Sequence, residues 1–207
     1  MKNVKSLLAI MVAATGVMWS QSCWGQGPSY VFSNLKLGLN APVFDGDGNR
    51  LTGTNYVAML YGGPAVDSLL PAWGEFVGFT MAPVPFTYMP LGQAGYFDSI
   101  VNGVGYVQIG NVACIDIPWL QVRAWDARLG NSYEEVVDLD IGGYGESNFF
   151  QKRGGLPYPC AMLPTPAERL LGLQSFALRE VIPEPSATLL LLLGLPALLL
   201  LCWRRSA

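Results

Sequence analysis

The stretch that decides the fold is Trp119-Leu-Gln-Val-Arg-Ala-Trp-Asp126, which lies beyond the middle of a chain of 207 residues. Its side chains alternate between two faces, with Leu120, Val122 and Ala124 on one and Gln121, Arg123 and Trp125 on the other. Alternation with a period of two residues is typical of a β-strand that packs one face on a core. The pattern therefore predicts a strand over 119–126 and makes Trp125 the aromatic residue expected to be most exposed.

Further runs of β-branched and aromatic residues lie on both sides of this stretch: Tyr30–Leu37, Asn55–Tyr61, Glu75–Met81, Tyr96–Ile100, Val104–Val112 and Leu173–Val181. Clusters of glycine and proline separate these runs, for example Gly62-Gly63-Pro64 and Gly142-Gly143-Tyr144-Gly145. Such clusters favour turns, because glycine reaches positive φ and proline fixes φ. Many short strands between regular turns predict an all-β fold, a single β-sandwich or jelly-roll-like domain.

One segment of this body has helical features. Ser132 is a suitable N-cap for a short helix ending at Leu139, and the acidic Glu134 and Glu135 would lie at the positive end of its dipole. The segment Leu156–Pro166 contains four prolines, so it is expected to be an extended loop.

The first 25 residues have the layout of a secretory signal peptide. Lys2 and Lys5 form a basic start, Leu7–Met18 is apolar, and Cys23-Trp24-Gly25 is a cleavage site with small residues before Gln26. A buried first helix and a lipoprotein cysteine at Cys23 are the alternatives. The residues before Cys23 lack the leucine and small pair that a lipoprotein signal requires, so export with cleavage after residue 25 is the prediction.

The last 25 residues combine a short polar motif, an apolar span and a basic end. The motif is Pro183-Glu184-Pro185-Ser186, the span runs over residues 187–203, and Arg204 and Arg205 follow it. As a helix the span would reach roughly 25 Å, at the short limit for a bilayer core of about 30 Å. The arginine pair favours the cytoplasmic side, because basic flanks resist translocation.

This three-part ending resembles the PEP-CTERM sorting signal of exported proteins in Gram-negative bacteria that have an exosortase. The resemblance implies export, transient anchoring in the inner membrane through 187–203, and processing by an exosortase near Pro183–Ser186. The product would then reach the outer surface or the extracellular space. An ordinary tail anchor that is never cut is the alternative, but it leaves the Pro-Glu-Pro motif unexplained.

Four stretches of the body resemble an uncharacterised group of PEP-CTERM proteins: Asn55–Pro64, Gln121–Asp126, Gly143–Phe150 and Leu171–Leu178. This second resemblance implies family membership only, because no activity comes with it. The chain is therefore divided into a signal peptide (1–25), a β-sandwich domain (26–182) and a sorting signal (183–207).

The mature domain is acidic and contains few cysteines. Residues 26–182 carry fourteen acidic and eight basic side chains, a net charge of −6. Nucleic-acid binding is excluded as a function class, since phosphates call for clustered lysine and arginine. The two remaining cysteines, Cys114 and Cys160, would form a disulfide in an oxidising compartment or stay as two buried thiols.

The chain contains no histidine, and this narrows the possible chemistry. Ser-His-Asp and Cys-His catalysis are excluded, as are a histidine-based zinc site and a zinc site of four thiolates. Paired carboxylates remain possible for a polysaccharide hydrolase, with Asp126, Glu134, Glu135 and Glu146 as the candidates. No spacing singles out a pair of them, so no catalytic residue, resident metal or cofactor is predicted.

The motif Asp45-Gly-Asp-Gly-Asn49 has acidic or amide side chains at alternate positions, as in a calcium loop. An EF-hand loop needs glycine at its sixth position and glutamate at its twelfth, where this chain has Arg50 and Tyr56. A tight turn is the preferred interpretation, and weak calcium binding by Asp45, Asp47 and Asn49 is the alternative.

Two function classes stay open at this point. The first is a non-catalytic cell-surface or extracellular-matrix protein with a structural or adhesive role. The second is a carbohydrate-binding module for exopolysaccharide, which would use aromatic side chains that stack on sugars. The structural role requires those aromatic side chains to be buried in the core, and the carbohydrate-binding role requires a row of them to be exposed beside carboxylates.

Overall fold

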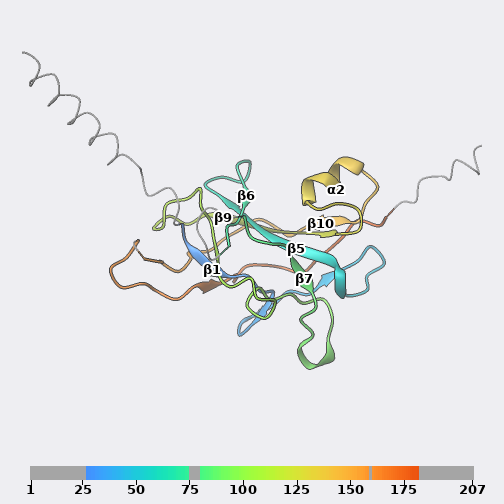
Figure 1. Cartoon of the computed structure of the whole chain (residues 1–207), viewed down its shortest axis with the longest axis horizontal. Helices are drawn as coiled ribbons and strands as arrows, with labels where there is room; N and C mark the ends of the chain where they lie inside the picture. The colour runs from blue at the N-terminus through green and yellow to red at the C-terminus, as the bar shows by residue number, and fades with distance from the viewer. Residues whose placement is uncertain (1–26, 75–79, 159, 182–207) are drawn as a thin grey trace, which may run out of the picture.

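A computed structural model describes residues 27–74, 80–158 and 160–181. The predicted signal peptide (1–25) and most of the Glu75–Met81 run lie outside the described residues. So do the three parts of the predicted sorting signal: the Pro183–Ser186 motif, the span 187–203 and the arginine pair. The described part is mostly β-structure, with several antiparallel sheets and one short α-helix (Figure 1). The predicted all-β class is confirmed at this level.

The largest sheet is built around β5 (Gly53–Gly63) and β9 (Trp119–Asp126), which pair antiparallel from Tyr56↔Asp126 to Gly63↔Trp119. Its other strands are β10 (Tyr144–Glu146), β11 (Phe150–Gln151), β6 (Leu70–Pro71) and β7 (Val84–Phe86). The strand predicted at 119–126 has the observed bounds of β9. The run predicted at 55–61 extends by two residues at each end in β5.

Smaller sheets hold the rest of the chain. β1 (Ser29–Val31) lies between β8 (Val107–Gln108) and β12 (Glu168–Arg169), β2 (Leu35–Lys36) pairs with β3 (Leu39–Asn40), and β4 (Val43–Phe44) pairs with β13 (Phe176–Ala177). The pairs β1–β12 and β4–β13 are parallel. A short 3-10 helix, η1, spans Pro90–Gly92. The strands predicted at 104–112 and 173–181 are therefore shorter than expected, and residues 96–100 form only isolated bridges.

The run predicted as one strand over Tyr30–Leu37 is broken by the fully buried Asn34. The Asn34 side-chain amide donates to the carbonyl oxygens of Ala41 and Gly95, each at 2.8 Å. Its Oδ1 accepts from the backbone N–H of Phe97, also at 2.8 Å. Buried polar groups must be paired, and here one side chain supplies hydrogen bonds that a neighbouring strand would supply. The chain bends at this point, and β1 and β2 form as separate strands.

β5 continues through Gly62 and Gly63, where the sequence predicted a turn. A Cβ on Gly62 would lie 2.6 Å from the Ile109 side chain, and one on Gly63 would lie 2.4 Å from the Ser68 carbonyl oxygen. These glycines therefore serve close packing inside a strand, a use that glycine also has.

The expectation that Trp125 is exposed is wrong, because its side chain is 1% exposed. Both faces of β9 are covered: Leu120, Val122 and Ala124 are fully buried on one side, and helix α2 (Tyr133–Leu139) packs over the other. The Trp125 ring meets the Tyr133 ring edge-on at 6.4 Å, and its indole N–H donates to the Gly130 carbonyl at 3.2 Å. Because the indole N–H has this hydrogen-bond partner, full burial of the side chain costs little free energy.

The helix itself was predicted correctly. The Ser132 hydroxyl accepts from the backbone N–H of Glu135 at 3.2 Å, and Glu134 and Glu135 occupy the first turn. Asp140 ends the helix in the left-handed conformation, with φ of 52°. This cap holds α2 over the large sheet and buries Tyr133 and Val136.

Candidate functional site

The last described strand, β13, lies between two other segments of the domain. β13 pairs in parallel with β4, and the Leu178 N–H donates to the Phe44 carbonyl at 2.9 Å. On its other side the Arg179 N–H donates to Tyr144 O at 2.8 Å, and Gly143 N–H donates to Arg179 O at 2.9 Å. Hydrogen bonds on both edges fix this segment up to Arg179.

Glycines make room for this exit segment, which we define as residues 176–181. A Cβ on Gly142 would lie 1.9 Å from the Glu180 carbonyl oxygen, and one on Gly145 would lie 2.4 Å from the Ala177 carbonyl oxygen. A Cβ on Gly46 would lie 2.5 Å from the Glu180 Cα. Because all three glycines meet backbone atoms, a side chain at any of them would require the exit segment to move.

Arg179 ties the exit segment to the large sheet through its side chain. Its Nη1 donates to the Tyr144 hydroxyl at 2.9 Å, and its guanidinium lies 4.9 Å from the centre of the same ring. The hydrogen bond and the cation–π contact act together on one tyrosine that is itself buried. The exit segment is thus held by side-chain as well as backbone contacts.

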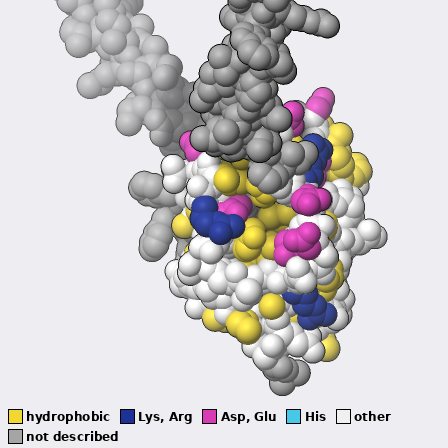
Figure 2. All heavy atoms as spheres, turned by 90° about the vertical axis from the view of Figure 1, so that its right-hand side faces the viewer, with side chains coloured by type: hydrophobic (Ala, Val, Ile, Leu, Met, Phe, Trp, Pro, Cys, Tyr) yellow, Lys and Arg dark blue, Asp and Glu magenta, His cyan; other side chains and the backbone are white. Residues whose placement is uncertain are grey.

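A hollow of about 190 Å³ lies beside the exit segment. Its lining comes from three parts of the chain: Asp45, Gly46, Asp47, Tyr56, Gly143, Leu178, Arg179, Glu180 and Val181. Figure 2 shows this end of the molecule, where apolar side chains form a recessed centre with acidic and basic side chains around it. Ligand pockets usually enclose about 300–1,000 Å³. The hollow is therefore smaller than an ordinary pocket for a small-molecule ligand.

The Asp45–Asn49 segment on the rim of the hollow is the predicted tight turn. Asp45 N–H donates to the Asn49 carbonyl at 2.8 Å, and the Asp45 Oδ1 accepts from the N–H groups of Asp47 and Asn49 at 3.0 and 2.8 Å. Asp45 Oδ2 accepts from the Asn49 side-chain amide at 3.3 Å. These contacts use both oxygens of Asp45 to stabilise the turn itself. Within the described ranges no group of three or more metal-ligating side chains gathers, around this turn or elsewhere.

Asp126, one of the candidate acids, forms an ion pair with Arg128 at the end of β9. Arg128 Nε donates to both Asp126 oxygens, at 2.9 and 3.1 Å, and the Arg128 guanidinium also lies 5.8 Å from the Tyr56 ring. Burial tends to raise the pKa of the Asp126 carboxyl, but hydrogen bonds and charge from Arg128 outweigh it and hold that pKa below its ordinary value. A carboxylate kept ionised in this way is a poor general acid.

The other candidate acids lie around α2 and also have partners. Glu134 accepts from the Tyr61 hydroxyl at 3.1 Å and pairs with Arg123 at 3.2 Å. Glu135 accepts from the Asn131 N–H at 2.7 Å, and Glu146 accepts from the Tyr133 hydroxyl at 3.4 Å. Each carboxylate makes a different structural contact. Those of Glu134 and Glu146 fasten α2 to the large sheet.

Beneath α2, Arg123 stacks between aromatic rings of the sheet and the helix. Its guanidinium lies 4.2 Å from the Tyr61 ring centre and 5.0 Å from that of Tyr133. Tyr133 also meets Tyr61 and Tyr144 edge-on, at 6.3 and 5.8 Å. These aromatic side chains are core anchors, as their burial shows. They form no exposed row for stacking on sugars.

Three buried tyrosines predict a loss of stability at high pH. Burial raises the pKa values of Tyr30, Tyr61 and Tyr133 above the ordinary value of 10.0, and the nearby charges of Glu168, Glu134 and Glu146 respectively add to this. The unfolded chain loses these protons above about pH 10 while the folded chain keeps them, so their contribution is present below pH 10 and lost above it. We expect the free energy of unfolding to fall by about 1.4 kcal/mol per pH unit for each tyrosine.

Urea titrations between pH 8 and pH 11.5 measure this slope. Tyr61→Phe removes one of the three ionising groups, so its stability above pH 10 should fall about a third less steeply than that of the native chain. At pH 8 the tyrosines are protonated in the folded and the unfolded chain. The difference in stability between Tyr61→Phe and the native chain at this pH therefore measures the lost hydrogen bond to Glu134. Equal slopes for both chains would contradict the assignment of Tyr61.

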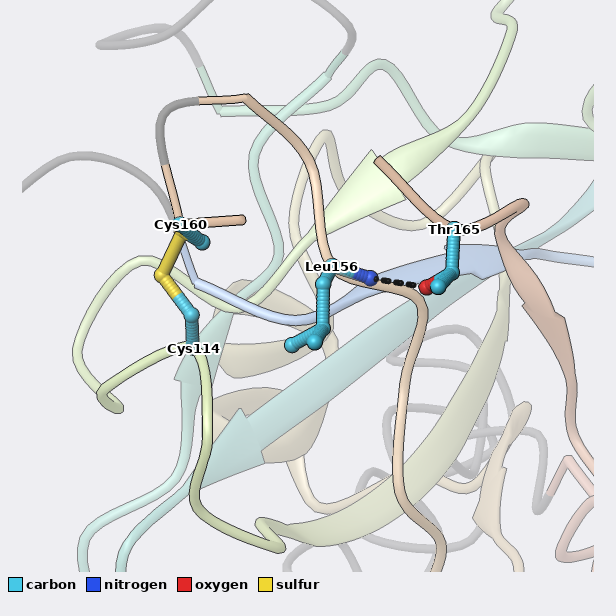
Figure 3. Close-up of a disulfide and its surroundings, with 4 residues drawn as sticks. All are labelled: Cys114, Leu156, Cys160 and Thr165. Carbon is cyan, nitrogen blue, oxygen red and sulfur yellow. Dashed lines mark hydrogen bonds between the residues drawn. A yellow bond between two sulfur atoms is a disulfide. The ribbon is translucent and has the colours of Figure 1, made fainter. Parts of the chain in front are cut away.

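The structure joins Cys114 and Cys160 by a disulfide, with their Cα atoms 5.9 Å apart (Figure 3). The bond fastens the Leu156–Pro166 segment, whose described residues (156–158 and 160–166) contain no strand or helix, as the sequence predicted. The base of this loop is closed separately: Leu156 N–H donates to the Thr165 Oγ1 at 2.7 Å, and Thr165 N–H donates to the Leu156 carbonyl at 3.0 Å. In Figure 1 this loop lies at the opposite end of the molecule from α2.

The sequence predicted a last strand over 173–181 but did not indicate the residues that hold this segment in place. Gly142 and Gly143 were interpreted as a turn alone, although a glycine cluster is also a signal for close approach of another segment. The sequence placed Gly46 in a tight turn and Arg179 in a strand, but nothing in it indicated that they fix the exit segment. The sorting residues Pro183–Ser186, Arg204 and Arg205 lie outside the described residues.

A comparison with family models, curated proteins and solved structures finds no match to this chain. Within residues 27–74, 80–158 and 160–181, no helix has the length and hydrophobicity needed to span a bilayer.

Proposed function

We infer that this chain is an exported protein, sorted by its C-terminal signal to the cell surface or extracellular matrix, where it has a non-catalytic structural or adhesive role. The observation that carries this proposal is the ordered ending of motif, apolar span and arginine pair at 183–205. In this scheme residues 1–25 are removed on export, 187–203 anchor the precursor in the inner membrane, and an exosortase processes the chain near Pro183–Ser186.

The geometry of the exit segment supports this proposal. The segment is held on both edges as far as Arg179, and only Ile182 separates Val181 from the first proline of the motif. A processing enzyme that acts at the motif would therefore work directly beside the hollow and its rim. The small volume of that hollow suits such a contact better than it suits a soluble ligand.

The arrangement of the sheets and the flanking segments is part of the same proposal. We assign residues 26–182 to one β-sandwich with jelly-roll-like connections, flanked by the signal peptide and the membrane-spanning sorting helix. Support comes from the core, in which Tyr30 and Val107 of a small sheet join Leu60 and Val122 of the large sheet in a single buried cluster. The disulfide agrees with an oxidising compartment outside the cytoplasm.

Burial of the aromatic residues favours a structural role over carbohydrate recognition. Trp125 and the tyrosines beneath α2 are buried in the core, and their polar groups bond to the protein. A carbohydrate-binding module for exopolysaccharide stays the alternative, and a polysaccharide hydrolase is more remote. Binding of the exported protein to arrays of acidic exopolysaccharides would favour the alternative over the structural role.

Deletion of residues 183–207 tests the sorting proposal. We expect the truncated chain to lose its signal peptide and to be exported as before, because the signal at the other terminus is intact. It should lack the membrane-bound precursor and the processed surface form that the full chain gives. Fractionation of host cells with intact-mass analysis measures both. Identical fractionation of the two chains would rule out sorting by this segment.

A substitution gives a finer test than the deletion. Replacing Pro183, Glu184 and Pro185 by alanine should leave a precursor that stays in the membrane uncut, since the span is unchanged. The matched control replaces Pro164 and Pro166, exposed prolines of the disulfide-fastened loop, by alanine. The control should be processed like the native chain. Normal processing of the motif variant would show that the Pro-Glu-Pro residues have no part in sorting.

A further inference from the structure

An exposed apolar surface surrounds the disulfide. Its members, here called the disulfide patch, are Ile115, Ile117, Tyr158, Met162 and Leu163, which are 65%, 52%, 72%, 96% and 85% exposed. They come from two parts of the chain, residues 115–117 and the described residues 158 and 160–163, that the Cys114–Cys160 bond brings together. Single exposed apolar residues are ordinary on protein surfaces, but five of them on two short segments joined by one disulfide indicate an interaction site.

The patch is held in place before any partner arrives. The disulfide fastens the tip of its loop, and the hydrogen bonds between Leu156 and Thr165 close the base (Figure 3). Arg153 Nη2 reaches the Ile115 carbonyl at 3.4 Å and links the two segments once more. Ordering a surface in advance lowers the entropy cost of binding, so a small patch can serve as a contact.

The charges at the patch are balanced and in part unpaired. Lys152 and Glu168 pair with each other at 3.5 Å, while Asp116 and Arg153 have no ion-pair partner among the described residues. Asp116 follows Ile115 in the chain, and Arg153 donates to the Ile115 backbone carbonyl, so one unpaired charge of each sign lies next to this residue. The patch is therefore electrically neutral and carries one donor and one acceptor for ion pairs.

The acidic excess of the domain lies at the other end. Glu134, Glu135 and Asp138 are on α2, while Asp45, Asp47 and Glu180 are grouped around the hollow. In Figure 1 α2 lies on the right, and the loop of residues 156–166 extends to the left in orange-brown. Two domains that meet through their disulfide patches would keep their acidic ends far apart, which minimises repulsion.

We propose that the disulfide patch binds the same patch of a second copy of this chain, in a two-fold symmetric contact. In such a contact Asp116 of each copy meets Arg153 of the other copy. One unpaired Asp116 and one unpaired Arg153 per copy therefore form two ion pairs. The apolar members are buried between these pairs. This inference goes beyond the sorting proposal and does not depend on processing at the motif.

Reversing the charges of Asp116 and Arg153 tests the contact between two copies. Full-length chains with two different affinity tags are co-expressed with export, treated on intact cells with a short amine-reactive cross-linker, and captured through one tag. Lys152 neighbours the patch and supplies the amine. The native pair should give a cross-linked dimer. Asp116→Arg alone or Arg153→Asp alone should give about tenfold less, because like charges then face each other.

The mixed pair decides the outcome. A chain with Asp116→Arg combined with a chain with Arg153→Asp places opposite charges at both positions, so the dimer should return to near its native yield. Met162→Asp should lower the yield, and Leu37→Asp, at a residue 84% exposed elsewhere, should not. Since recovery in the mixed pair requires folded chains, misfolding cannot imitate it. No dimer from the native chain, unchanged yield in the single variants, or no recovery in the mixed pair would overturn the proposal.

Discussion

Gly142→Ala should lower the free energy of unfolding by about 3–5 kcal/mol and loosen the exit segment. Gly142 has a φ of 90°, and its new Cβ would lie 1.9 Å from the Glu180 carbonyl oxygen. Strain of about 1–3 kcal/mol adds to the hydrogen bonds of Gly143 and Arg179, worth about 1 kcal/mol each, that are lost when the segment moves. Urea unfolding of the purified mature protein measures the change, and earlier tryptic cleavage after Arg179 would report the local loosening.

Gly48→Ala is the matched control for this variant. Gly48 has a φ of 83°, almost the same backbone conformation, but a Cβ there meets nothing within 4 Å. Its substitution should cost only the conformational term, about 1–2 kcal/mol. The difference between the two variants isolates the clash with the exit segment. If the free energy of unfolding falls equally in both variants, the close approach of Glu180 to Gly142 does not affect stability.

Replacing Cys114 and Cys160 together by serine should lower the free energy of unfolding by about 4 kcal/mol. The two residues are 46 apart in sequence, and the chain-entropy model assigns about this value to the closure of such a loop in the unfolded chain. The double substitution avoids an unpaired thiol that single variants would leave. Thermal and urea unfolding of the native and variant proteins measure the difference under oxidising conditions.

Reduction provides the control for the disulfide. With excess dithiothreitol the native protein should become as unstable as the double serine variant, while the variant itself should not change. A native protein that unfolds at the same urea concentration with and without reductant would show that the bond contributes nothing. The cross-linked dimer should fall in parallel, because the loop that carries Met162 and Leu163 would no longer be fastened.

The sequence alone predicts the elements whose signals lie within a few neighbouring residues. The strand at 119–126, the helix capped by Ser132, the Asp45–Asn49 turn and the proline-rich loop each follow from the residues within them. Alternation, an N-cap and turn residues all act over a few positions. The same signals therefore predict these elements whatever the rest of the chain does.

The remaining features depend on partners distant in the chain. Trp125 follows the strand alternation, yet it is buried because α2 covers the second face of β9. The run from Tyr30 is broken by Asn34, which bonds to segments as far away as Phe97. Gly142 and Gly46 matter because Glu180 lies against them. No window along the sequence contains these pairs, so propensity and pattern could not reveal them.

The pairing of β13 with β4 also sets an order of events in time. Phe176 lies beside Val43, a separation of 133 residues, and the intervening sheets contribute to the same core. Contacts this distant form late in folding, because the whole intervening chain must be ordered to bring them together. In the export scheme proposed above, the chain crosses a membrane from its first residue onward and keeps one edge of β4 open until its final segment emerges. Completion of the domain and arrival of the proposed sorting signal would then fall at nearly the same moment.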